Sequence, residues 1–215
     1  FQLGASDTDA YANAISINPS GQIFVGGKAR STNSSPESWV IMTSTNQGNS
    51  WSSSMVYNRN AGFAASAQGL YSKNDDMSFA VGYAEDSSTN PHWITMRYTA
   101  GAWTVVDDYI DSGANPSSYA YAIVSDTSSS SVFAAGGSYN STRNTFLWAL
   151  RYSLDDGNTW SLGPSYDPGA GANTYGYAIA MGANSNSILT IGAADFNPLL
   201  YEHAWASRQA TYSAG

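Results

Sequence analysis

The chain of 215 residues has room for one sizeable hydrophobic core, and a single domain spanning 1–215 is the expected organisation. Its formal charge is −8 with only eight Lys and Arg residues, so it has no basic stripe to neutralise phosphates, and nucleic acid is excluded as an expected partner. No apolar run approaches the ~18 residues of a membrane span, whereas 42% apolar residues are enough to form a folded core.

The sequons and the composition bear on the cellular compartment of the protein. Zero cysteines exclude disulfides and thiolate metal sites but do not fix the location. Two glycosylation sequons begin at Asn33 and Asn140, and the acidic, Lys-poor composition points the same way, so an extracellular, secreted protein is expected. The first residue is Phe1, so the chain either follows a processed leader or is a fragment.

Similar segments recur four times, about 55 residues apart. Each copy opens with a stretch of small and aromatic residues, at 11–15, 62–66, 119–123 and 175–179. A turn and a small apolar strand ending in glycine follow, at 23–26, 79–82, 132–136 and 188–192. The third strand opens with a tryptophan in every copy: Trp39, Trp93, Trp148 and Trp205. Because Gly or Pro interrupts every long stretch and none has a helical period, the sequence predicts an all-β fold.

A conspicuous turn follows the third strand. In the third copy it reads S-L-D-D-G-N-T-W over 153–160. The Asp155 carboxylate is expected to accept backbone N–H bonds, Gly157 to supply a positive φ, and Trp160 to anchor the next strand. The first copy is near-complete at 44–51, the second is shortened at 98–103, and the fourth keeps only traces at 207–212.

This turn resembles the Asp-box of the bacterial neuraminidase repeat family of β-propellers. The resemblance implies a four-bladed β-propeller of four-stranded antiparallel blades, at roughly 11–57, 62–110, 118–166, and 174–215 plus 1–6. Residues 1–4 read like residues 160–163, so the N-terminal strand is expected to close the last blade and remove an open sheet edge. The alternative is a slice of a larger propeller.

The face with the long loops between second and third strands is the expected binding surface. The principal hypothesis is a non-catalytic, lectin-like module that binds carbohydrate or a glycoconjugate there. The candidate ligand-binding residues are Trp93, His92, Arg143, Tyr139, Tyr201 and Glu202. Aromatic residues open the innermost strands and follow the glycine strands, where they either stack on sugar rings or fill gaps between blades. They are Tyr11, Phe63, Tyr119, Tyr121, Tyr175, Tyr177, Tyr83, Tyr139, Phe196 and Tyr201.

A metal is a further hypothesis. His92 and His203 occupy similar places in different blades and either cap strands or share a metal. Oxygen ligands from several blades could hold Ca²⁺ in the central channel; otherwise no cofactor is expected. The carboxylates concerned are Asp7, Asp9, Asp107, Asp108, Asp111 and Asp167, which also suit solvated turns.

Two other functions stay open. Asp-box propellers include sialidases, but the Arg-Ile-Pro motif of those enzymes is missing and only six arginines are present. A glycoside hydrolase acting at the channel mouth could still use a carboxylate pair such as Glu202 and Asp195. The third alternative is a structural or protein-binding propeller, because repeats of this kind specify fold more than activity.

Overall fold

The computed structural model describes residues 9–167, 169, 171–182, 187–197 and 202–211; for 196, 197, 202, 203 and 210 it describes the backbone only. These residues form four antiparallel sheets, which we call blades 1 to 4 in chain order. The described residues contain no helix, and accordingly none long and apolar enough to cross a membrane. The all-β, four-bladed propeller architecture predicted from the repeats is therefore confirmed.

Each of the first three blades has four strands, and the described part of the fourth has three. Blade 1 contains β1 (Ala10–Ile17), β2 (Ile23–Ala29), β3 (Ser38–Ser44) and β4 (Ser52–Tyr57). Blade 2 contains β5 (Ala65–Ser72), β6 (Ser78–Glu85), β7 (Pro91–Thr99) and β8 (Ala102–Tyr109). Blade 3 contains β9 (Ser118–Ser125), β10 (Val132–Asn140), β11 (Thr145–Ser153) and β12 (Ser161–Leu162). Blade 4 contains β13 (Thr174–Met181), β14 (Ser187–Asn197) and β15 (Glu202–Thr211).

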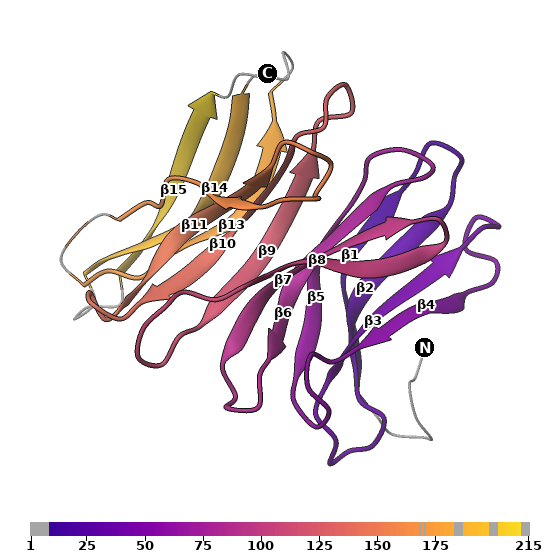
Figure 1. Cartoon of the computed structure of the whole chain (residues 1–215), viewed down its shortest axis with the longest axis horizontal. Helices are drawn as coiled ribbons and strands as arrows, with labels where there is room; N and C mark the ends of the chain where they lie inside the picture. Colours follow the sequence, from indigo (N-terminus) through magenta and orange to yellow (C-terminus); the bar gives the residue numbers. More distant parts are fainter. Residues whose placement is uncertain (1–8, 168, 170, 183–186, 198–201, 212–215) are drawn as a thin grey trace.

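The blades follow one another as an arc. The innermost strands pack in sequence, β1 on β5, β5 on β9, and β9 on β13. Figure 1 shows blade 1 and blade 4 at opposite ends of the long axis, with blades 2 and 3 between them. The predicted closing strand at 1–4 lies outside the described residues.

Tryptophan on glycine is the contact that joins successive blades. The tryptophan of the third strand is fully buried in blade 1 (Trp39) and blade 2 (Trp93), and it is 3% exposed in blade 3 (Trp148). A Cβ on Gly82 would lie 3.0 Å from Trp39, one on Gly136 would lie 2.5 Å from Trp93, and one on Gly176 would overlap the Trp148 indole. In blades 2, 3 and 4 the missing side chain of a glycine thus leaves room for the tryptophan of the preceding blade.

Blade 4 repeats the tryptophan without a covering blade. Trp205 is 90% exposed, and it borders an apolar hollow with Tyr177 and Ile191. No described strand packs over this face. The environment of the indole, not the strand that carries it, therefore differs between Trp205 and its three counterparts.

The turn at 153–160 has the predicted hydrogen bonds. Asp155 accepts from the Thr159 N–H at 2.8 Å and from the Ser153 and Thr159 hydroxyls, both at 2.7 Å. Gly157 has φ 81°, and the Trp160 indole N–H donates to its carbonyl at 3.1 Å. The first copy keeps this geometry with an amide, since Asn46 accepts from the Ser50 N–H at 2.9 Å.

The loops on the expected binding face are shorter than predicted in blades 2 and 3. Only 86–90 separate β6 from β7, and only 141–144 separate β10 from β11. In blade 2 the reason is a tight turn, in which the Asp86 carboxylate accepts the N–H groups of Ser88 and Asn90 at 2.8 and 2.9 Å. The strands therefore run almost to the tip of the hairpin.

Replacing the buried tryptophans tests the interblade contact. Trp39→Ala or Trp93→Ala removes a fully buried indole and should lower the free energy of unfolding by about 3–5 kcal/mol. Trp205→Ala removes an exposed one and should cost less than about 1 kcal/mol. Urea denaturation of the three variants measures the difference, and equal losses at all positions would contradict the assignment.

A second prediction concerns pH. The hydrogen bonds from Thr159 and Ser153 lower the pKa of Asp155 to about 2. The ionised form therefore stabilises the fold above about pH 4, and this contribution is lost as the pH falls towards 2. Asp155→Asn keeps an acceptor, as Asn46 does, but removes the charge.

The free energy of unfolding should accordingly fall more steeply between about pH 5 and pH 2 in the wild type than in Asp155→Asn. Denaturation series at several pH values measure the two slopes. The reverse substitution, Asn46→Asp, is the matched control and should steepen the dependence. Parallel curves for all three proteins would show that the turn carboxylate is not linked to folding.

Candidate functional site

Aromatic side chains gather around the innermost strands of blades 3 and 4. Tyr119 stacks on Tyr121 with centroids 6.3 Å apart, and Tyr175 stacks on Tyr177 at 5.8 Å. The two pairs meet where Tyr121 and Tyr177 approach edge-on at 5.1 Å. We call these four residues, together with Tyr83 and Phe146, the axial aromatic cluster.

The cluster is assembled across blade boundaries. Tyr119 of β9 reaches back over blade 2 to contact Tyr83 edge-on at 5.3 Å. Tyr175 of β13 reaches back over blade 3, where it lies 5.2 Å from Phe146 and above Gly137, whose missing side chain leaves room for the ring. Tyr119 and Tyr175 therefore fill gaps between blades, as one of the two sequence hypotheses stated, while the side chains of Tyr11 and Tyr177 are about half exposed.

The phenols of the cluster are hard to ionise. Burial, followed by the negative charges of Glu37 and Glu85, raises the pKa of Tyr83 to about 12. Burial, with neighbouring Tyr177 and Asp195, raises the pKa of Tyr175 to about 12, and burial likewise raises the pKa of Tyr121. The phenols therefore present neutral hydroxyl groups over the whole physiological range.

Carboxylates stand at the rim of the cluster. Glu85 and Asp195 occupy equivalent positions in blades 2 and 4. Glu85 follows Gly82 of β6 by three residues, and Asp195 follows Gly192 of β14 by three residues. The Glu85 N–H donates to the Ala64 carbonyl at 2.8 Å, and the Asp195 N–H donates to the Asn173 carbonyl at 2.9 Å. Because β6 lies in blade 2 and β14 in blade 4, the two carboxylates belong to the blades on either side of blade 3. Besides burial, the charge of Glu85 raises the pKa of Tyr83 and Tyr119, and the charge of Asp195 raises the pKa of Tyr175 and Tyr177.

Glu37 is the third carboxylate near the cluster. It lies just before β3 and accepts a hydrogen bond from the Lys28 ammonium at 2.9 Å, with Arg30 3.6 Å away. Lys28 also lies over the Tyr11 ring, 5.2 Å from its centroid. Glu37 is thus neutralised by two cations, whereas Glu85 accepts a backbone N–H, from Ala64 at 3.1 Å.

Two of the predicted ligand-binding residues lie in the protein interior. Trp93 is fully buried in the core between blades 2 and 3, which corrects its placement on an exposed binding surface. His92 is 7% exposed; its Nδ1 lies 2.6 Å from Asp108 and its Nε2 lies 3.6 Å from Asp86. The alternative interpretation of His92, a polar residue capping a strand, describes this arrangement.

Arg143 and Tyr139 lie near the β10–β11 hairpin. Arg143 forms an ion pair with Asp167, and the Tyr139 hydroxyl donates to Asn144 at 2.6 Å. Tyr139 also contacts Phe146 edge-on at 5.4 Å, which connects it to the axial aromatic cluster. Tyr201 lies outside the described residues, and for Glu202 only the backbone in β15 is described, so their predicted roles are untested.

Three of the carboxylates expected to hold Ca²⁺ form ion pairs with arginine. Asp107 pairs with Arg151, Asp108 pairs with Arg59 and His92, and Asp167 pairs with Arg143. Asp7 and the His203 side chain lie outside the described part of the structure. Within the described part, no three or more His, Cys, Asp or Glu side chains form a metal-sized group.

Comparisons with known proteins identify the fold. No protein-family model and no curated protein sequence matches the chain. An α-L-arabinanase of Penicillium chrysogenum, solved with arabinobiose, matches with a TM-score of 0.67 at 12% identity, over 98% of this chain and 66% of that one. An α-L-arabinofuranosidase of Fusarium graminearum, also solved with arabinobiose, matches with a TM-score of 0.66 at 10% identity, over 100% of this chain and 67% of that one. An endo-arabinase of Bacteroides thetaiotaomicron matches with a TM-score of 0.52 at 12% identity, over 99% and 78%.

These matches place the chain among β-propellers by fold, and the chain spans about two thirds of the length of the first two. They also correct the principal hypothesis. The similar structures are glycoside hydrolases, so a non-catalytic lectin is contradicted and the hydrolase alternative is favoured. The carbohydrate-related part of the prediction agrees with them.

The rim carboxylates were only partly found from the sequence. The sequence offers Asp195, with Glu202, as a hydrolase candidate, but no local motif marks Glu85. The signal that could have found it is its register, because the residues three places after Gly27, Gly82, Gly136 and Gly192 are Arg30, Glu85, Tyr139 and Asp195.

The raised pKa values give the cluster a testable signature. Folded Tyr83 and Tyr175 keep protons that the unfolded chain loses above about pH 10, so the free energy of unfolding should fall as the pH rises from about 10 to 12. Tyr121→Phe removes one buried hydroxyl and should make this fall shallower. Denaturation series across this range measure the slope, with Tyr152→Phe, outside the cluster, as the control. An unchanged slope in Tyr121→Phe would contradict the assigned environment.

Proposed function

We propose that the chain is the substrate-binding and catalytic part of a secreted glycoside hydrolase that acts on arabinose-containing oligosaccharides at the axial aromatic cluster. The observation that carries the proposal is the position of two carboxylates, Glu85 and Asp195, at equivalent places of β6 and β14, in the two blades on either side of the one that contains Tyr119 and Tyr121. The substrate class comes from the arabinobiose complexes of two structures with the same fold.

Each part of this site has a chemical role. Tyrosine rings offer a flat apolar surface for the C–H face of a sugar and hydroxyl groups for its oxygens. Hydrolysis of a glycosidic bond uses one carboxylic acid to protonate the leaving oxygen and one carboxylate on the other side of the sugar as base or nucleophile. Glu85 and Asp195 are the candidates for this pair, and such chemistry needs no cofactor.

Glu37 and Lys28 have a supporting role in the proposal. Their ion pair is 2.9 Å long and lies beside Tyr83, where it fixes local charge and offers an ammonium group to sugar hydroxyls. The Asp-box resemblance of the 153–160 turn is kept as a hypothesis about repeat ancestry, because that turn contributes hydrogen bonds to the scaffold only.

Sugar release from arabino-oligosaccharides tests the proposal. The wild type should release arabinose or arabinobiose, and Glu85→Gln and Asp195→Asn should each lower the rate by at least ~100-fold while leaving the thermal transition in place. Asp76→Asn, which removes a carboxylate from the β5–β6 turn, is the control and should keep full activity.

Two results would contradict the proposal. One is the absence of product from every arabinose-containing oligosaccharide offered. The other is full activity in both Glu85→Gln and Asp195→Asn, which would place the chemistry elsewhere.

A further inference from the structure

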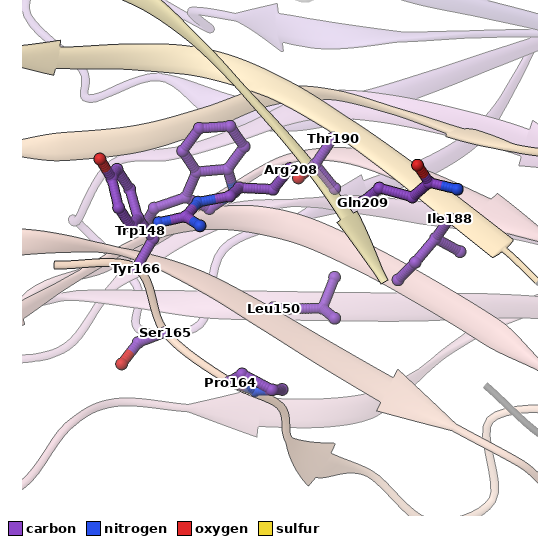
Figure 2. Close-up of a pocket in the computed structure, with 9 residues that line it drawn as sticks. All are labelled: Trp148, Leu150, Pro164, Ser165, Tyr166, Ile188, Thr190, Arg208 and Gln209. Carbon is purple, nitrogen blue, oxygen red and sulfur yellow. The ribbon is translucent and has the colours of Figure 1, made fainter. Parts of the chain in front are cut away.

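A cavity of about 260 Å³ opens between blades 3 and 4, away from the axial aromatic cluster. Figure 2 shows Arg208 of β15 beside Tyr166, with Leu150 and Pro164 below them. The guanidinium lies over the Tyr166 ring, 3.5 Å from its centroid. Among the described side chains, Arg208 has no carboxylate partner.

The equivalent place between blades 2 and 3 holds a complete ion pair. Arg151 lies over the Tyr109 ring at 4.2 Å, and its Nε and terminal nitrogen donate to the two Asp107 oxygens at 2.5 and 2.6 Å. Both charged side chains are less than a tenth exposed. This is the bidentate geometry in which a guanidinium recognises a carboxylate.

The register of the blades makes the two places directly comparable. The two tyrosines occupy equivalent positions, because Tyr109 pairs with Trp93 and Tyr166 pairs with Trp148. The two arginines do so as well, because each pairs with the residue two places before Gly136 or Gly192. Asp107 stands two residues before its tyrosine. In blade 3 that position is Pro164.

The interface between blades 1 and 2 shows that the two residues at these places change together. Between blades 1 and 2 the two places are taken by Met55 and Met96, which pack in one apolar cluster with Tyr57. The pair is therefore apolar in the first interface and ionic in the second. In the third interface the arginine is present, the carboxylate is replaced by proline, and the cavity occupies the space.

We propose that this cavity binds a carboxylate supplied by a ligand, namely a uronic acid residue of an acidic saccharide, with Arg208 as its anchor. The ligand carboxylate would take the place that Asp107 holds in the neighbouring interface. The walls suit one sugar ring, since Tyr166, Leu150 and Ile188 provide apolar contact, and Thr190 and Gln209 provide hydroxyl and amide groups. The volume is slightly below that of pockets for drug-sized ligands, which fits a single ring.

Calorimetric titration with oligogalacturonate tests the proposal, with the neutral galactose oligomer of equal length and with acetate as comparison probes. The wild type should bind the uronate oligomer at least tenfold more tightly than either comparison probe. Arg208→Gln, a surface substitution whose folding is checked by circular dichroism, should weaken uronate binding at least tenfold.

Pro164→Asp gives a second, independent variant. It places a carboxylate two residues before Tyr166, as Asp107 stands before Tyr109, and should occupy Arg208 internally. We expect uronate binding to weaken at least tenfold in this variant while the fold is retained. The measurement needs no hydrolysis, so its outcome is separate from that of the proposed glycosidase activity.

Three outcomes would overturn the proposal. The first is the absence of uronate binding to the wild type, and the second is unchanged binding in Arg208→Gln. The third is equal or tighter binding of acetate, or of an acidic peptide, which would show that the site does not select a sugar carboxylate.

Discussion

The insertion of a tryptophan into a glycine-lined space on the next blade is the contact on which the rest of the structure depends. Trp39, Trp93 and Trp148 are buried, and each lies against a glycine of the next blade at which a Cβ would come within 3.0 Å of the indole. A single sheet of four strands has one face too apolar for water, so the blades are stable because they cover one another. Trp205 occupies the same register position in blade 4 but is exposed, because no described blade covers it. The burial of the other three indoles therefore comes from the neighbouring blade.

The same packing creates both candidate sites. Because successive blades approach closely at glycine, aromatic rings on one inner strand reach the second strand of the preceding blade, as Tyr175 does over Gly137. This brings residues from three blades into one cluster whose rim carries Glu85 and Asp195. Farther from the innermost strands, the same pair of positions holds two methionines between blades 1 and 2 and an ion pair between blades 2 and 3. Between blades 3 and 4 it borders a cavity. The scaffold is therefore uniform, and the two proposed sites differ from it at a few variable register positions.

The repeat spacing predicts the fold, because glycine and tryptophan recur in phase in all four copies. The sites were harder to predict. Tryptophan suits both a sugar-binding surface and a core, and the sequence does not reveal that Trp93 is covered by blade 3. His92 was open to two interpretations until its contacts with Asp86 and Asp108 were seen. Glu85 lies near tyrosine rings of another blade, and in the sequence only the comparison of the same register position in all four blades draws attention to it.

A double-mutant cycle on Trp148 and Gly176 tests the interblade contact most directly, because the atoms nearest to a Cβ on Gly176 would all belong to the Trp148 indole. Gly176→Ala should destabilise the wild type, yet be neutral or slightly stabilising in the Trp148→Leu background, where the space is free. The unfolding free energies should therefore show a coupling of at least about 1 kcal/mol. If the two changes are additive, the blades are not joined by this contact, and the account of the fold is contradicted.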